Sequence, residues 1–214
     1  MNKITIDHAI PNVFQDGRVL TGEVWNQYVE LEKGKCYLIE AASGTGKSSM
    51  LSFVYGYRRD YSGEIRFDDR KLCTLSTAEW VEIRRHSLSI LFQELRLFPE
   101  LTARENVCIK NNLTKFKTPA EIDAYFEALG IADKKDQPCG KLSFGQQQRV
   151  AMIRTLCQPF DFAFLDEPIS HLDDTNSAIM GRLITEEAMR QGAGIVVTSI
   201  GKHMELDYDT ILKL

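Results

Sequence analysis

Residues 41–48 combine glycines, a lysine and hydroxyl side chains at a spacing that can bind phosphate. They match the phosphate-loop pattern GxxxxGK[ST] at every place except the first, and with the next residue they are Ala41, Ala42, Ser43, Gly44, Thr45, Gly46, Lys47, Ser48 and Ser49. In such a loop, backbone N–H groups and the positive end of the following helix hold the β-phosphate of a nucleotide. We expect Lys47 to reach the β- and γ-phosphates and Ser48 to bind Mg²⁺. Alanine can stand at position 41 if its φ is negative, because only a positive φ requires glycine.

A pair of carboxylates supplies the rest of the chemistry that a nucleotide site needs. Asp166 and Glu167 follow the apolar run 160–165, so that Asp166 can meet Mg²⁺ through water while Glu167 polarises an attacking water. By themselves, two acids after an apolar run are also found at solvated strand ends, and the loop alone could be an ordinary strand–turn–helix. Together they predict a site for ATP and Mg²⁺.

Alternating short apolar runs and segments of helical period predict the elements that position these residues. The runs that read as strands are 36–40, 87–92, 160–165 and 194–198. This pattern indicates a mostly parallel sheet with helices packed on it. Ligands of an open parallel sheet bind at the carboxyl ends of its strands, which is where the loop, Gln93, Asp166 and Ser199 fall.

Two smaller units are expected beside this sheet. Between residues 94 and 142 the strand signal fades and the stretch 120–129 reads as an amphipathic helix, which indicates an inserted helical subdomain. Residues 4–29 and 63–68 suggest a small antiparallel sheet. We therefore expect one α/β domain over residues 1–214, with a mostly parallel core sheet, a flanking antiparallel β-subdomain and a helical subdomain at roughly 94–142.

Composition excludes several other classes of protein. The formal net charge of −4 leaves no basic stripe for a phosphate backbone, so we expect no nucleic-acid partner. The five cysteines form no C-x-x-C pair, which disfavours a zinc site or a disulfide framework. No apolar run approaches the roughly 20 residues that span a bilayer, so we expect a chain that is soluble by itself.

The stretch 142–149, Leu-Ser-Phe-Gly-Gln-Gln-Gln-Arg, resembles the signature of the ATP-binding cassette family, which is usually LSGGQ followed by a QR pair. It stands between Gln93, which looks like the Q-loop glutamine, and the Walker B acids, in the family's order. Residues 170–173, Ser-His-Leu-Asp, look like the D-loop, and Phe14 lies where the family places an aromatic ring that stacks on adenine. A plain core phenylalanine is the alternative at position 14. The resemblance covers nearly the whole chain.

The resemblance implies a P-loop NTPase fold in which two cassettes enclose two ATP molecules, each held by the phosphate loop of one and the signature of the other. It assigns Ser143, Gly145 and Gln146 to the ATP of the second cassette and Asp173 to contacts across the dimer. Glu167 would be the catalytic carboxylate. Gln93 would bind the metal beside Ser48 and Asp166 and couple the γ-phosphate to the helical subdomain.

Two residues depart from the family's pattern. Phe144 replaces the first signature glycine, at a place that varies in the family. Ser199 stands where a histidine normally contacts the γ-phosphate, and a hydroxyl can hydrogen-bond but cannot carry positive charge. His203 lies close in sequence, but we expect it to be a surface or capping residue. The prediction is a domain that binds ATP well and hydrolyses it slowly.

The expected function is that of a transporter's ATPase subunit, cytoplasmic and peripheral on the inner face of the membrane, working with a second cassette and a separate integral permease. Residues 97–107 resemble small transport ATPases of macrolide-type exporters and lipoprotein-release complexes. One alternative is a nontransport ATP switch of a membrane complex, as in bacterial cell division, and another is a slow member of a heterodimer. A soluble cassette of translation or DNA repair is disfavoured, since it would carry two cassettes or a coiled-coil insertion.

Overall fold

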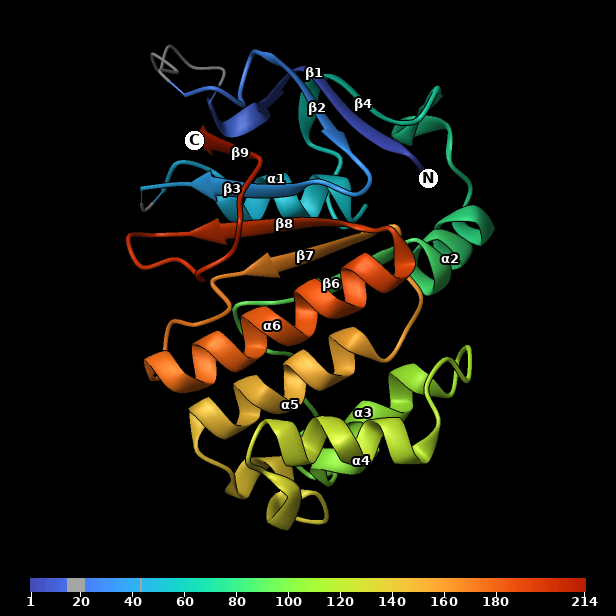
Figure 1. Cartoon of the computed structure of the whole chain (residues 1–214). Coiled ribbons are helices and arrows are strands. Elements are labelled where there is room, and N and C mark those ends of the chain that lie inside the picture. Colours follow the sequence, from blue (N-terminus) through green and yellow to red (C-terminus); the bar gives the residue numbers. More distant parts are fainter. Residues whose placement is uncertain (15–21, 43) are drawn as a thin grey trace.

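The computed structural model of the chain describes residues 1–14, 22–42 and 44–214, and Figure 1 shows the course of the chain. The strands are β1 (Lys3–Pro11), β2 (Tyr28–Glu32), β3 (Cys36–Glu40), β4 (Tyr61–Phe67), β5 (Arg70–Lys71), β6 (Leu88–Leu91), β7 (Phe162–Asp166), β8 (Gly194–Ser199) and β9 (Thr210–Lys213). The helices are α1 (Lys47–Val54), α2 (Thr77–His86), α3 (Ala103–Asn111), α4 (Pro119–Ala128), α5 (Phe144–Leu156) and α6 (Asp174–Gln191). Short 3-10 turns lie at Asn12–Phe14, Leu72–Thr74, Ala132–Lys134 and Cys139–Lys141.

The core is a parallel sheet with the strand order β6-β7-β8-β3-β9. The four apolar runs that the sequence marks as strands become β3, β6, β7 and β8, which confirms the predicted parallel core. Because all four run in the same direction, their carboxyl ends lie at one edge of the sheet. Register places Asp166 opposite Thr198 and Glu40 opposite Ser199, so the ends of β7, β8 and β3 are neighbours.

Strands β3, β6, β7 and β8 are buried on both faces, which is why they read as nearly uninterrupted apolar runs, whereas the edge strand β9 is largely exposed. Successive side chains of a strand point to opposite faces. In β3, Leu38 enters a core that it shares with α5 and α6, whereas Tyr37 and Ile39 enter a second core with α1, α2 and the strands of the antiparallel sheet. Figure 1 shows α5 and α6 lying side by side on one side of the sheet. Each fully buried aliphatic side chain contributes about 1.5–3 kcal/mol to this arrangement.

A second, antiparallel sheet has the order β2-β1-β4-β5 and lies at the top of Figure 1. Strands β1 and β4 lie largely in the two segments predicted for this sheet, 4–29 and 63–68, whereas β2 extends beyond residue 29 and β5 lies after residue 68. The predicted flanking β-subdomain is therefore confirmed.

Helices α3 and α4 lie between β6 and α5, within the region predicted to be helical. The predicted helix 120–129 is α4. Both helices begin with a capping box, in which Thr102 pairs with Glu105 and Thr118 with Glu121. Such a box satisfies two otherwise unpaired backbone N–H groups, which stabilises the start of a short helix. Helix α3 packs on α5, which begins just after this region.

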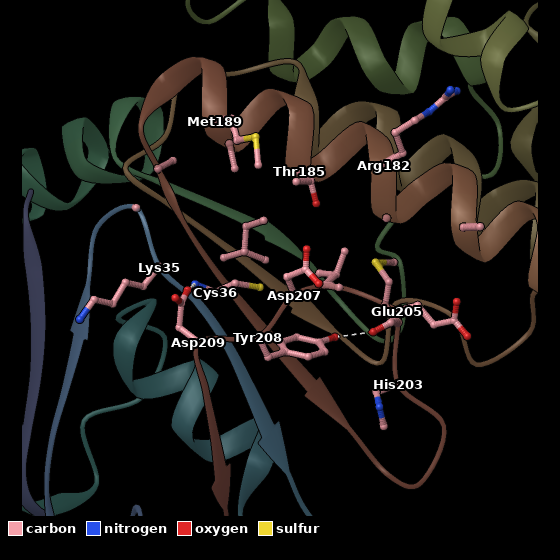
Figure 2. Close-up of a pocket in the computed structure, with 18 of the residues that line it drawn as sticks. Lys35, Cys36, Arg182, Thr185, Met189, His203, Glu205, Asp207, Tyr208 and Asp209 are labelled. Atoms are coloured by element: carbon pink, nitrogen blue, oxygen red, sulfur yellow. Dashed lines mark hydrogen bonds between the residues drawn. The ribbon is translucent and has the colours of Figure 1, made fainter.

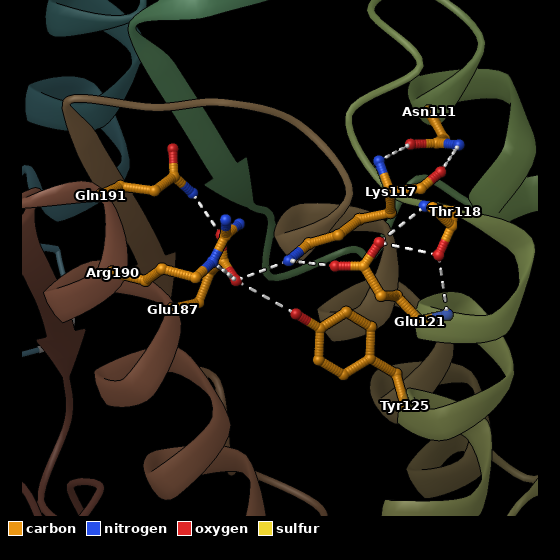
Figure 3. A network of polar contacts seen from close by, with 8 residues as sticks. All are labelled: Asn111, Lys117, Thr118, Glu121, Tyr125, Glu187, Arg190 and Gln191. Carbon is orange, nitrogen blue, oxygen red and sulfur yellow. Dashed lines mark hydrogen bonds and ion pairs between the residues drawn. The ribbon is translucent and has the colours of Figure 1, made fainter.

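A buried group of polar side chains ties the α3–α4 connection to α6 (Figure 3). The Nζ atom of Lys117 lies 2.7 Å from Oε2 of Glu187, which also accepts a hydrogen bond from the Tyr125 hydroxyl at 3.2 Å. Arg190 and Gln191 donate to Oε1 of Glu187, each at 2.6 Å. This network holds the helical region against the core.

In the described part of the chain, no helix combines the length and the apolar character needed to cross a membrane.

Candidate nucleotide-binding site

The phosphate-binding loop leads from the end of β3 into α1, which begins at Lys47. Gly46 has φ +97°, and a Cβ there would lie 2.8 Å from the Phe14 ring and 3.0 Å from Trp25 Nε1, so this place requires glycine. Ala41 does not adopt a positive φ, which is the condition under which alanine can replace the first glycine. Ser43 lies outside the described residues. The loop therefore has the strand–turn–helix setting that phosphate binding requires.

Lys47 lies between the two carboxylates that follow β7. Its Nζ atom contacts Oε1 of Glu167 and lies 3.9 Å from Oδ1 of Asp166. The lysine is only 6% exposed, and burial lowers its pKa, an effect that Asp166 opposes. The structure thus brings together the loop lysine and both acids, although they lie far apart in the sequence.

Asp166 is the last residue of β7 and is buried. The Thr198 hydroxyl donates to its Oδ1 atom at 2.5 Å. Burial raises the pKa of Asp166, and the Thr198 hydrogen bond and Lys47 work against that rise. Thr198 thereby fixes the carboxylate and helps to keep it ionised, as metal binding requires.

The oxygen atoms near Lys47 suit Mg²⁺ better than a metal ion whose ligands all come from protein side chains. The described residues contain no group of three or more histidine, cysteine or acidic side chains that could hold a metal ion. Magnesium usually takes one or two carboxylates together with phosphates and waters. The Asp166 carboxylate and the exposed Ser48 hydroxyl, at the start of α1, are ligands of that kind. Gln93 is exposed just after β6, and the structure shows it with neither carboxylate as a hydrogen-bond partner.

Glu167 has a backbone conformation that residues other than glycine rarely adopt, with φ +47°. Its N–H donates to the Thr198 carbonyl at 3.1 Å, and its carbonyl accepts from Gln148 Nε2 at 3.3 Å. These contacts hold a conformation that costs about 1–3 kcal/mol. They turn the Glu167 carboxylate toward Lys47.

Ser199 ends β8 between the other strand ends and is 3% exposed. Its hydroxyl donates to the Lys202 carbonyl, and its own carbonyl accepts from the Ala41 N–H at 3.0 Å. Ser199 therefore lies among the strand ends that form the site, but its hydroxyl proton is already donated to the Lys202 carbonyl. His203 packs against Tyr208, with ring centroids 6.1 Å apart, and does not turn toward the strand ends.

Two aromatic residues lie against the loop. Phe14 ends a 3-10 turn, is 9% exposed and touches Gly46. Trp25 Nε1 donates to the Thr45 carbonyl at 2.9 Å. The structure places Phe14 beside the phosphate loop and within the second core, as a plain core phenylalanine would lie, so its contact with adenine stays a prediction. Trp25 holds the loop, and the sequence pattern does not indicate it.

The segment 142–149 opens α5. The Ser143 hydroxyl accepts from the Gln146 N–H at 3.3 Å, and Gln146 Oε1 accepts from the Ser143 N–H at 2.9 Å. Gly145 is needed for close packing, since a Cβ there would lie 3.1 Å from the His171 carbonyl oxygen. Asp173 caps α6 by accepting from the Asn176 N–H at 2.8 Å.

Within the described residues, Ser143, Gly145, Gln146 and Asp173 form no hydrogen bond or ion pair with Lys47, Asp166 or Glu167. The chain therefore carries two separate half-sites. One is the loop with its acids, and the other is the start of α5 with the loop before α6.

Residues 26–170 match the family model described as ABC transporter. The chain belongs to the ABC transporter family. It is an ATP-binding cassette, and the matched range contains the loop 41–48, the segment 142–149 and the acids Asp166 and Glu167. The roles of these residues as Walker A, signature and Walker B segments, and of residues 170–173 as the D-loop, stay predictions.

Solved cassettes have the same fold. The dimeric structure of MJ0796, a bacterial ABC transporter cassette, is 26% identical with a TM-score of 0.75, over 92% of this chain and 87% of that chain. A post-hydrolysis dimer of MJ0796 bound to ADP and Pi has a TM-score of 0.74 at 26% identity, over 92% of this chain and 87% of that one. The cassette is also similar to cbiO1 from Clostridium perfringens, part of the ABC transporter complex cbiONQ, at 25% identity and a TM-score of 0.68, over 92% of this chain and 78% of that one.

The cassette has a further cavity of about 830 Å³, between α6 and the segment 203–209 (Figure 2). None of the predicted site residues lines it. Its walls include Glu205, Asp207 and Asp209, which have no ion-pair partner among the residues that the structure describes. Lys35 and Arg182 also line the cavity, so its charge is mixed, and its described lining offers no glycine-rich loop for a phosphate.

The sequence analysis did not predict two contacts of this site in the ABC cassette. Thr198 orients Asp166, and Gln148 holds the backbone of Glu167. A threonine inside an apolar strand carries no signal of its own. The glutamine run that follows Gly145 is unusual for a helix face and is the signal that could have indicated Gln148.

Proposed function

We propose that this cassette binds ATP and Mg²⁺ at Lys47 and Asp166, hydrolyses ATP with Glu167 as the catalytic carboxylate, and works as a dimer that drives an integral membrane permease. The observation that carries the proposal is the position of Lys47 between Asp166 and Glu167 at the carboxyl ends of β3 and β7. The buried Lys47 ammonium can exchange its carboxylate counterion for the γ-phosphate of a nucleotide, because both are anions that accept hydrogen bonds from it.

Binding of ATP then changes the state of Glu167. Lys47 turns from the carboxylate to the phosphates, and the N–H groups at the start of α1 hold the β-phosphate. The carboxylate of Glu167 becomes free to accept a hydrogen bond from the attacking water. Mg²⁺, with Asp166, Ser48 and Gln93 as the proposed ligands, neutralises charge that develops on the phosphates. The Phe14 ring beside the loop is the proposed adenine contact.

The second half-site is proposed to complete the ATP site of another cassette. The Ser143 hydroxyl accepts from Gln146 N–H, and its own proton has no acceptor among the described residues. The N-terminal end of α5 also offers a positive dipole and backbone donors to an anion. Asp173 would act at the same interface. The solved MJ0796 structures are dimers of that cassette, which supports a dimer here.

A surface beside Gln93 is proposed to receive the permease. Tyr57 and Phe98 are 48% and 51% exposed. The guanidinium of Arg96 lies 3.9 Å from the centroid of Phe92 and 5.2 Å from that of Tyr57. An exposed aromatic and arginine cluster is typical of a protein interface. It lies where the core meets the helical region, so a cytoplasmic segment of a membrane partner could sense movement of both. We therefore propose that the cassette works on the cytoplasmic face of the membrane.

A nontransport ATP switch is the second candidate, and one observation favours it. The hydroxyl of Ser199 is engaged by the Lys202 carbonyl, so β8 offers no side-chain donor to the γ-phosphate at that position. Unless another group supplies one, hydrolysis is slow and the ATP-bound state is long-lived. A long-lived state suits a regulator, or one slow half of a heterodimer.

The test combines turnover with partner capture. Purified cassette should hydrolyse ATP with Mg²⁺, and Glu167→Gln should lose about 10²–10⁴-fold in kcat while retaining ATP binding. Tagged Glu167→Gln with ATP, extracted from native membranes in mild detergent, should retain a multi-span permease. Capture of a membrane complex with no transport activity would favour the nontransport ATP switch. Capture of soluble partners alone would overturn both the transporter and the switch proposals.

A further inference from the structure

The imidazole of His171 lies against the signature, on the surface that the proposed dimer turns toward the second ATP. Its ring centroid is 4.3 Å from that of Phe144, with an angle of 60° between the ring planes. The His171 carbonyl oxygen touches the place where a Gly145 side chain would stand. Both His171 and the Phe144 ring are exposed. A histidine ring therefore stands beside Phe144 and Gly145 of the proposed signature, although it belongs to the loop that follows Glu167.

The orientation of the imidazole leaves one ring nitrogen available. Nδ1 lies 2.9 Å from the Ser170 hydroxyl. When that hydroxyl donates to Nδ1, the proton of the neutral ring is on Nε2, and the protonated ring carries a proton there as well. Within the described residues, Nε2 has no hydrogen-bond partner. His171 thus presents an N–H donor to whatever lies opposite the signature.

Among the described residues, the end of β8 offers the phosphate half-site no such donor. The Thr198 hydroxyl donates to Asp166 and the Ser199 hydroxyl to the Lys202 carbonyl, so both polar side chains there are engaged. His203 lies against Tyr208. Charge that gathers on the γ-phosphate during hydrolysis is then neutralised by Lys47, the loop amides and the proposed Mg²⁺ on one side and by the second copy's signature on the other. A further donor aimed at that charge is typically worth 10²–10³-fold in rate.

We propose that His171 supplies this donor across the dimer, with Nε2–H hydrogen-bonded to a γ-phosphate oxygen of the ATP that the second copy holds. The inference rests on the proposed function, because it needs the signature of one cassette to face the ATP of the other. In the reaction the water oxygen bonds to the γ-phosphorus and the bond to the β–γ bridging oxygen breaks. ADP leaves, and the water proton passes to Glu167 and then to solvent. His171 donates a hydrogen bond throughout and undergoes no net change in protonation.

Single substitutions of His171 distinguish hydrogen-bond donation by its imidazole from packing of its ring against Phe144. His171→Ala should lower kcat on the order of 10²-fold, with little change in ATP binding. His171→Phe keeps a ring against Phe144 and should be as slow as His171→Ala, whereas His171→Gln keeps an N–H donor and should recover part of the rate. His171 is exposed, so thermal unfolding should be the same for all variants. Wild-type turnover by His171→Phe would overturn the proposal.

A mixing experiment tests whether His171 acts in the second copy's site. Each ATP site takes Glu167 from one copy and His171 from the other, so a mixed dimer of Glu167→Gln and His171→Ala contains one intact site. Random mixing of the two slow variants should restore on the order of a quarter of the wild-type rate, because about half of the dimers are mixed. If His171 acted within its own chain, no mixed dimer would have an intact site and the rate would stay low.

The control uses Ser143→Ala mixed with Glu167→Gln, which tests the proposed dimer without involving His171. Recovery in this control together with recovery in the His171 mixture supports the inference. Recovery in the control alone overturns the role of His171 and leaves the proposed function standing. Recovery in neither mixture contradicts the shared ATP site itself.

Discussion

Lys117 Nζ lies 2.7 Å from Glu187 Oε2, and both residues are only 4% exposed. Burial raises the pKa of Glu187, but hydrogen bonds from Arg190 and Lys117 outweigh it and the net shift is downward. The pair joins the α3–α4 connection to α6 (Figure 3), so it fixes how the helical region lies on the core.

Glu187→Ala should therefore destabilise the cassette by about 3–5 kcal/mol, since it removes the nearer counterion of the buried Lys117 ammonium and leaves only the Glu121 carboxylate, 3.8 Å away. The matched control is the double variant Lys117→Met and Glu187→Met, which removes both charges and should cost much less. Urea unfolding of the three proteins measures the difference. A single variant as stable as the double variant would contradict the buried-pair argument.

The contact between Lys47 and Glu167 must break before Lys47 can bind phosphate. Glu167→Gln removes the competing charge, so it should tighten ATP binding by roughly tenfold, or about 1.4 kcal/mol, while it slows hydrolysis. Calorimetry with monomeric protein checks this. Asp133→Asn, which removes an exposed carboxylate paired with Lys134, should leave ATP affinity unchanged. Weaker binding by Glu167→Gln would show that the ion pair helps to shape the site.

Gly46 and Gly44 offer a matched pair in the Walker A loop. Both have a positive φ, but a Cβ at Gly46 would press on Phe14 and Trp25, whereas a Cβ at Gly44 meets nothing within 4 Å. Gly44→Ala should cost about 1–2 kcal/mol of stability from backbone strain alone, and Gly46→Ala distinctly more. Thermal unfolding without nucleotide measures this directly. Equal losses would mean that the Phe14 and Trp25 packing is not rigid.

Lys110, in α3, should make the stability depend on pH above neutrality. Burial lowers its pKa to about 8, and the like charges of Arg154 and Arg84 add to the effect. Between pH 8 and the ordinary lysine value of 10.5, the unfolded chain binds the proton and the folded chain does not, so this group makes the free energy of unfolding rise with pH.

Lys110→Met should accordingly stabilise the cassette by about 2 kcal/mol at pH 7. The gain over wild type should shrink as the pH rises from 8 toward 10.5. Urea unfolding across that range gives the comparison, with Lys141→Met as the exposed control. A gain that does not change with pH would assign the effect to packing instead of charge.

The sequence by itself determined the parallel core and the chemistry of its ligand. Strands buried on both faces must read as apolar runs, so 36–40 and 194–198 were recognisable without a structure. The glycine–lysine loop and the Ser143 cap with Gln146 are local patterns, because their hydrogen bonds close within a few residues. The predicted extent of the helical subdomain, and the roles of the individual site residues, stay predictions.

Tertiary structure alone decided which polar groups are free to act. Strand order places Lys47 beside Glu167 and the Thr198 hydroxyl beside Asp166. The same packing sets the His171 ring on Phe144. Such contacts join residues whose separation along the chain carries no periodic signal. They exist only because the crossovers of a parallel sheet bring distant strand ends to one edge.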